Sequence, residues 1–173
     1  MLPLFLGLFY PFLTLWTKSS FFNPAMGYTL DGAYFIEIRD PTDFEAIQWI
    51  RENLPLGVIS EAVGGSYNSD YARISTHTGF PTVLGWPGHE SQWRGGYEEI
   101  GSRENDVAIL YQTRNWSDAQ LILNSYDIDY VYIGSAERSM YENLDEQKFE
   151  VYMELIYVNG EVRIYARKGA LIP

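Results

Sequence analysis

The sequence contains no cysteine and only two histidines among its 173 residues. Without cysteine the chain cannot form a disulfide, hold zinc through thiolates or use a thiol nucleophile, although this absence does not fix the compartment. The two histidines, His77 and His89, do not have the spacing of a metal-ligating pair, and Glu90 points away from its neighbour His89. The sequence therefore predicts no metal site and no cofactor.

Positive charge is also scarce. The chain carries 12 Lys and Arg residues against 23 Asp and Glu residues, which gives a net charge of -11. Nucleic acid is therefore not a predicted partner. The chain also has no Gly-x-Ser-x-Gly or phosphate-loop pattern, and Gly64-Gly65 lacks the remaining residues of a dinucleotide fingerprint. These catalytic and nucleotide-binding motifs therefore give no indication of whether the chain is an enzyme.

The first 17 residues contain no charge and are rich in Leu and Phe. A membrane span needs about 20 apolar residues, and this run is slightly short and contains Pro3 and Pro11. It has neither the basic start and cleavage site of a secretory signal nor the polar face of a core helix. Trp16 and Lys18 are typical of an interfacial belt. We therefore expect residues 1–22 to be the end of a transmembrane helix, with a buried core helix as the alternative.

Residues 23–173 have the composition of one soluble domain, and about 150 residues suffice for a real core. The chain contains 14 Tyr and 5 Trp. Such amphipathic rings suit a domain that lies at a membrane interface or binds sugars, and an aromatic-rich core explains them equally well.

Apolar periodicity and turn residues predict an alternation of strands and helices. The predicted strands cover residues 33–38, 58–62, 82–84 and 129–133, and a hairpin covers 151–167 around Asn159-Gly160. The predicted helices cover residues 40–53, 69–76, 104–113 and 117–126, with an irregular, partly helical segment before residue 102. This order predicts a three-layer α/β domain, in which helices flank a mixed sheet that ends in an antiparallel hairpin.

Polar and aromatic residues gather where two predicted neighbouring strands end. Because such strand ends meet at one edge of a sheet, we expect a binding site there. The predicted site consists of Glu61, Arg73, His89, Glu90, Trp93 and Arg94. A carboxylate can accept sugar hydroxyls, an indole can stack on a sugar ring and an arginine can hold phosphate. The alternative is a structural cluster in which Glu61 pairs with Arg73 or Arg94, and Glu90 pairs with Arg94 one helical turn away.

Several segments together resemble one protein family. They are Leu30-Asp31-Gly32, Phe44–Asn53, Glu61-Ala62, Tyr71–Ser75, Thr78-Gly79, Pro81–Trp86, His89-Glu90, Gln92–Gly95, Tyr130–Gly134 and Glu137-Arg138. These segments are similar to the C-terminal region of the YYY membrane-protein family, large multi-pass proteins of bacteria and archaea with no established activity. The resemblance covers essentially the whole chain after the N-terminal segment. Its most specific part is the string from Gly85 to Gly95.

This family in turn looks like the membrane glycosyltransferases of the GT-C architecture. The resemblance implies a multi-pass part that binds a polyprenyl-phosphate-linked sugar, followed by a soluble domain on the extracytoplasmic side of the cell membrane. GT-C catalysis depends on acidic residues between early membrane helices, which would precede Met1, so we expect any catalytic base to lie outside this chain.

A second resemblance is to the soluble domain of oligosaccharyltransferase catalytic subunits. It rests on Trp49–Asn53 followed by the strand Val58–Ser60. In those enzymes the strand leads into a Trp-Trp-Asp-Tyr-Gly motif that recognises the acceptor peptide. Glu61–Gly65 stands in its place here, so peptide recognition is not implied.

The sequence thus leaves two function classes. One is an accessory domain that binds the glycan acceptor or the polyprenyl-phosphate sugar donor of a membrane glycosyltransferase. The other is a non-catalytic folding or protein-interaction domain of a membrane protein.

Overall fold

The computed structural model describes residues 2–24 and 27–170. The chain divides into two compact units, Met1–Arg39 and Asp40–Pro173.

The first unit contains helix α1 (Leu2–Lys18) and helix α2 (Tyr34–Arg39). The helical prediction for the N-terminal segment is confirmed, with Pro11 inside α1. Phe12 and Phe21 both make edge-on ring contacts with Trp16. In the parts of the chain that the structure describes, no helix combines the length and hydropathy needed to cross a membrane. The assignment of residues 1–22 to the end of a transmembrane helix stays a prediction.

The strand predicted over residues 33–38 is wrong, because this segment forms helix α2. Its Phe and Ile residues favour a strand, but Asp31 starts a helix. The Asp31 carboxylate accepts a hydrogen bond from the backbone N–H of Ala33 at 2.8 Å. The backbone N–H of Tyr34 donates to the Asp31 carbonyl at 3.3 Å. A local side-chain hydrogen bond of this kind offers the backbone a helical turn in place of a strand.

The second unit is built on a four-stranded mixed sheet with the order β1-β2-β4-β3. The strands are β1 (Val58–Ser60), β2 (Ile128–Ile133), β3 (Glu154–Asn159) and β4 (Val162–Ala166). Strand β1 runs parallel to β2, and β4 runs antiparallel to both β2 and β3. The predicted mixed α/β fold and its C-terminal hairpin, which turns at Gly160 with a φ of 56°, are therefore confirmed.

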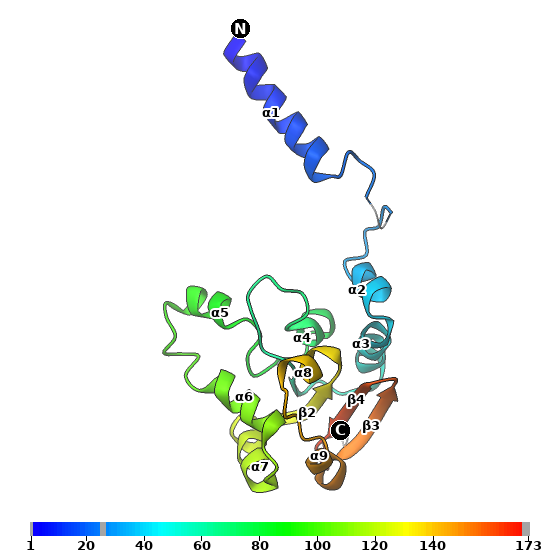
Figure 1. Ribbon diagram of the computed structural model, residues 1–173, viewed down its shortest axis with the longest axis vertical. Helices are drawn as coiled ribbons and strands as arrows, with labels where there is room; N and C mark the ends of the chain where they lie inside the picture. The colour runs from blue at the N-terminus through cyan, green and yellow to red at the C-terminus, as the bar shows by residue number, and fades with distance from the viewer. Residues whose placement is uncertain (1, 25–26, 171–173) are drawn as a thin grey trace. The chain divides into compact units, whose positions relative to one another are not determined.

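Helices cover both faces of the sheet (Figure 1). Helix α3 (Pro41–Asn53) buries Ala46, Ile47 and Ile50, and its Trp49 ring lies 4.9 Å from the ring of Tyr157 in β3. Helices α6 (Arg103–Gln112) and α7 (Trp116–Ser125) lie on the other face. The core on that side includes Val107, Leu110, Tyr111, Ala119, Leu123, Val131, Ile133, Phe149 and Tyr165. Side chains of β2 alternate between the two layers, as its pleat requires.

Several predicted boundaries differ from the structure: β1 ends at Ser60 rather than at residue 62, and α4 covers Arg73–Thr78 rather than residues 69–76. Residues 82–84 do not form a ladder, because only Thr82 makes an isolated parallel bridge, to Ile59. Pro81 precedes that bridge and has no N–H with which to extend the pairing. The hairpin begins at Glu154 rather than at residue 151, because residues 147–152 form helix α9 (Gln147–Tyr152).

Four further helices are short; two of them come after β1, one follows β2 and one leads into β3. They are α4 (Arg73–Thr78), α5 (Pro87–Arg94), α8 (Ser135–Met140) and α9. The first two overlap segments predicted to be at least partly helical, and Gly79 closes α4 with a φ of 80°. The sequence does not predict helices α8 and α9. Each has only six residues, which is too few to show the helical spacing of apolar side chains.

A chain that begins at Asn23 is expected to fold and remain soluble without detergent. The charged surface and the core belong to the residues that follow, whereas side chains such as Phe9, Tyr10 and Leu15 are more than half exposed. Size-exclusion chromatography and circular dichroism of this shortened chain test the expectation. If it aggregates while the full chain is monomeric without detergent, α1 is part of the core.

Candidate functional site

Arg73 lies at the centre of a buried group of charged side chains. Its side chain is 2% exposed and forms ion pairs with Asp43 of α3 and Glu137 of α8. The two Arg73 Nη atoms donate to the two Glu137 carboxylate oxygens at 3.1 and 3.0 Å. The Tyr132 hydroxyl donates to the other oxygen of Asp43 at 2.5 Å, and the guanidinium lies over the Tyr132 ring. We call Asp43, Arg73, Tyr132 and Glu137 the Arg73 cluster.

Glu137 connects the ends of the two parallel strands. Besides Arg73, it accepts hydrogen bonds from the backbone N–H groups of Ala62, after β1, and Gly134, after β2, at 2.7 and 2.8 Å. Burial acts to raise the pKa of Glu137, but the charge and hydrogen bonds of Arg73 outweigh it and hold the pKa below its ordinary value. For Asp43 burial wins, and its pKa is raised in spite of Arg73. The cluster is therefore held in its charged form chiefly through Arg73 and Glu137.

Gly134 shows how closely this cluster is packed. A Cβ atom at this position would lie 2.9 Å from the Asp43 carboxylate and 3.0 Å from the Arg73 guanidinium. Only glycine leaves room for the charged groups at the end of β2.

Glu61 caps the start of helix α4. It follows β1, is 1% exposed, and accepts the backbone N–H groups of Ile74 and Ser75, both at 2.8 Å. The helix needs this distant partner, because its N-cap residue, Ala72, provides no side-chain hydrogen bond. Burial raises the pKa of Glu61, and the charge of Arg73 opposes the shift.

Glu61 and Arg73 therefore both lie in the interior, next to one another but without a direct hydrogen bond. Both side chains are buried and structural, as in the alternative stated above, but the pairing of Glu61 with Arg73 or Arg94 that it predicted is wrong, because Glu61 bonds the backbone of α4. The carboxylate partners of Arg73 are instead Asp43 and Glu137. Sequence reasoning missed both partners. Asp43 and Glu137 lie 30 and 64 residues from Arg73 along the chain, so no local spacing connects them to it.

The other four predicted site residues lie on helix α5. The imidazole of His89 lies 5.4 Å from the ring of Tyr67 and 5.9 Å from the rings of both Trp86 and Trp93. The Trp93 indole N–H donates to His89 Nε2 at 2.7 Å. Tyr67 and Trp93 are 77% and 79% exposed. We call Tyr67, Trp86, His89 and Trp93 the α5 aromatic cluster. It presents flat rings to the surface.

A shallow pocket of about 210 Å³ lies beside this cluster. It is lined by Ala72, Ser75, Thr76, Thr82, Gly85, Trp86, His89 and Glu90. Its volume is below the roughly 300 Å³ of the smallest typical pockets for drug-sized ligands. The pocket is therefore suited to a small group, such as a single sugar ring, with an indole, hydroxyls and a carboxylate around it.

Glu90 is the charged acceptor of this pocket. One of its oxygens accepts the backbone N–H of Gly85 at 3.1 Å, and the other lies 3.8 Å from the Arg94 guanidinium. Arg94 also lies 3.8 Å from Glu99, and its side chain is 54% exposed. The predicted pairing of Glu90 with Arg94 is confirmed. It is an exposed pair, which adds at most about 1 kcal/mol to stability, so Arg94 has no buried carboxylate partner of the kind that Arg73 has.

The structure thus divides the six predicted residues into two groups. Within residues 2–24 and 27–170, the α5 residues make no hydrogen bond or ion pair with Glu61 or Arg73. His89 and Glu90 line the pocket, whereas Trp93 and Arg94 lie outside its lining. The same described ranges contain no group of three or more His, Asp or Glu side chains placed to hold a metal ion.

Comparisons with known proteins give a likeness in structure and none in sequence family. No protein-family model matches the chain, and no curated protein does. Among solved structures, the chain is similar to the C-terminal globular domain of an oligosaccharyltransferase from Archaeoglobus fulgidus. The TM-score is 0.46 at 15% sequence identity, over 72% of this chain and 95% of that one. At these values the likeness is coarse: the chain has a structural neighbour in a domain of such an enzyme.

Proposed function

We propose that residues 23–173 form a saccharide-binding accessory domain of a membrane glycosyltransferase that uses a polyprenyl-phosphate sugar. In this proposal residues 1–22 are the end of a transmembrane helix, and the domain lies on the extracytoplasmic side of the cell membrane. The catalytic groups belong to the membrane part of the parent protein.

The observation that carries the proposal is the α5 pocket. Trp86 supplies an aromatic wall, and the Glu90 carboxylate is held at the pocket by the Gly85 N–H. Sugars combine apolar ring faces with many hydroxyl groups, so an indole beside a fixed carboxylate is a fitting arrangement for them. The exposed Trp93 ring extends the aromatic surface beyond the pocket.

Helix α1 supports the membrane part of the proposal. Phe9, Tyr10, Phe12, Leu15 and Trp16 are all more than 40% exposed. Isolated apolar side chains are common on protein surfaces, but an uncharged run of them along one helix, ending at Lys18, indicates contact with a membrane or with other helices.

Replacing Glu90 with glutamine is expected to weaken saccharide binding by about 10- to 100-fold. This corresponds to losing one hydrogen bond to a charged acceptor, about 1.5–3 kcal/mol. Glutamine keeps an oxygen for the Gly85 N–H, so the thermal melting point should stay near that of the wild type. Isothermal titration of the full chain in detergent micelles with neutral oligosaccharides measures the affinity.

Glu99→Gln is the matched control, because Glu99 is exposed and also lies near Arg94 but does not line the pocket. The control should bind as the wild type does. Equal loss of affinity in both variants, or no binding of any neutral saccharide by the wild type, contradicts the proposal.

A specific observation also favours a protein-interaction role. Tyr67, Trp93 and Tyr97 are 77%, 79% and 65% exposed, and exposed aromatic rings are enriched at protein interfaces. If no saccharide binds and Trp93→Ala releases the domain from the membrane part of its parent protein, this second function replaces the first.

A further inference from the structure

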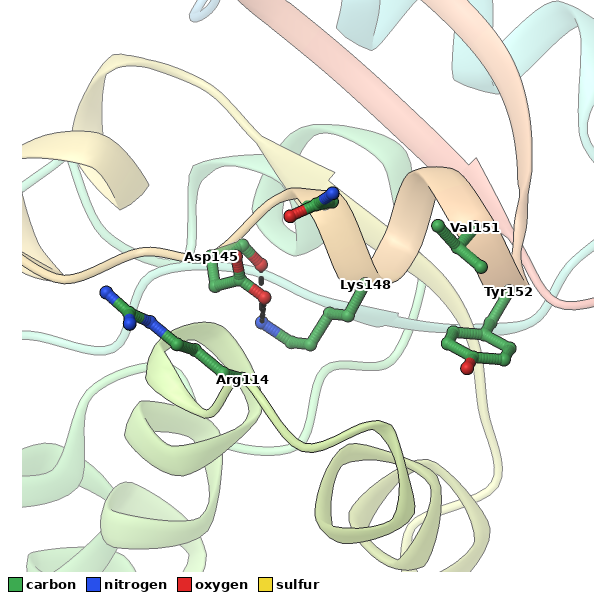
Figure 2. Close-up of a pocket in the computed structure, with 6 residues that line it drawn as sticks. Arg114, Asp145, Lys148, Val151 and Tyr152 are labelled. Atoms are coloured by element: carbon green, nitrogen blue, oxygen red, sulfur yellow. Dashed lines mark hydrogen bonds and ion pairs between the residues drawn. The ribbon is translucent and has the colours of Figure 1, made fainter.

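A second pocket lies between helix α9 and the linker that joins α6 to α7. It has a volume of about 430 Å³ and is lined by Arg114, Asp145, Gln147, Lys148, Val151 and Tyr152. Figure 2 shows Lys148 extending toward Asp145, with Tyr152 on the other side of Lys148. None of these residues belongs to the α5 pocket or to the Arg73 cluster.

Lys148 places an almost enclosed ammonium group at this pocket. Its side chain is 2% exposed. Its Nζ donates to the backbone carbonyls of Tyr111 and Asp145 at 2.9 and 2.5 Å. The Asp145 carboxylate lies 4.0 Å away, which is too far for a hydrogen bond. An ammonium has three donors, so the two carbonyls leave one donor of Lys148 without a hydrogen bond; its other neighbours are the Phe149 ring, 4.3 Å from Nζ, and the ion-paired Asp145 carboxylate.

Arg114 adds a second cation that is not engaged elsewhere. Within residues 2–24 and 27–170, its exposed guanidinium makes no hydrogen bond or ion pair. Five N–H donors in a fixed fork match the oxygens of a phosphate or a carboxylate. Among the described residues that line the pocket, Asp145 is the single acid.

Tyr152 provides an aromatic surface between this pocket and the next. Its ring stacks on Trp116, with centroids 4.7 Å apart and planes 11° apart. Both rings also line a neighbouring pocket of about 320 Å³, which contains Arg167 and Lys168. Four of the 12 cationic residues of an acidic chain therefore lie around one aromatic stack.

We propose that this region is a second binding site, selective for anionic saccharides, in which Lys148 and Arg114 hold the oxyanion and the sugar ring packs on Tyr152. The oxyanion is a phosphate or a carboxylate carried by the sugar, since both present oxygens that an ammonium and a guanidinium bind. The site is separate from the α5 pocket, and it does not rest on the function proposed above.

The test uses the full chain in detergent micelles, with the indole N–H signal of Trp116 as the reporter in NMR titrations. Glucose 6-phosphate and glucuronate are the anionic probes, and glucose is the neutral one. At least one anionic probe is expected to shift the Trp116 signal saturably, because a sugar on Tyr152 changes the environment of the stacked indole. Whether the phosphate or the carboxylate probe binds more tightly identifies the oxyanion.

Arg114→Gln should weaken the binding of that probe at least tenfold without changing the melting point, since Arg114 is exposed and makes no contact that the fold needs. Arg51→Gln is the control. It removes the same charge from an exposed position on α3 and should leave the affinity unchanged. The proposal is overturned if neither anionic probe shifts Trp116, if glucose binds there equally well, or if the two variants lose affinity alike.

Discussion

Replacing Arg73 with methionine is expected to lower the free energy of unfolding by at least about 3–5 kcal/mol, the cost of removing one partner from a buried ion pair. Arg73 faces two buried carboxylates, Asp43 and Glu137, and its charge also stabilises ionised Glu61. Methionine fills a similar volume but leaves these acids without a cation. Since domains of this size have a total stability of about 5–15 kcal/mol, the variant should be unfolded or close to it. Urea denaturation followed by circular dichroism measures the change.

Arg94→Met is the control for this prediction. Arg94 is more than half exposed, and its two carboxylate partners lie 3.8 Å away, so the loss should be below about 1 kcal/mol. If the two variants are equally stable, the Arg73 cluster does not hold the end of the sheet together.

Replacing Glu137 with glutamine should have the second largest effect, with a dependence on pH. At neutral pH the variant loses the ion pair with Arg73. The backbone N–H groups of Ala62 and Gly134 donate to different oxygens of Glu137, so glutamine keeps an acceptor for only one of them and turns its NH2 group toward the other. We expect a destabilisation of about 3–5 kcal/mol.

The sign of the pH dependence follows from the lowered pKa of Glu137 in the folded protein. The stability that ionised Glu137 contributes is fully present above the ordinary pKa of 4.5 and is lost as the pH falls through the lower folded value. The difference between wild type and variant should therefore be constant near neutral pH and shrink below about pH 4. Urea titrations across this range measure it. A difference that grows toward low pH would show that Glu137 is not ionised in the fold.

Local signals predicted much of the fold. Helix α3 falls within the helix predicted over residues 40–53. Its start is local in sequence, because the Asp40 side chain accepts the Asp43 N–H within the same turn. The hairpin forms at Asn159-Gly160 because Gly160 adopts the positive φ, 56°, that its tight turn requires. For residues 33–38 the side-chain types favour a strand, but the hydrogen bond that Asp31 accepts from Ala33 starts a helix instead.

The candidate site was less predictable because its contacts are distant in sequence. The spacing of Glu90 and Arg94 on one helix identified their pair directly. No spacing rule connects Arg73 to Glu137, which meet only after β1 and β2 have paired. Lys148 likewise has no motif, and its buried position depends on the packing of α9 against the end of α6.

The most direct test of the proposed function is an NMR titration of the full chain in detergent micelles with a neutral oligosaccharide. Each of the five tryptophans, Trp16, Trp49, Trp86, Trp93 and Trp116, has one indole N–H signal. Because the Trp86 indole lines the α5 pocket and the Trp93 indole donates to His89 beside it, saturable shifts should appear at these two signals and not at the other three. Shifts confined to the other three tryptophans, or none at any signal, would contradict a saccharide-binding site at α5.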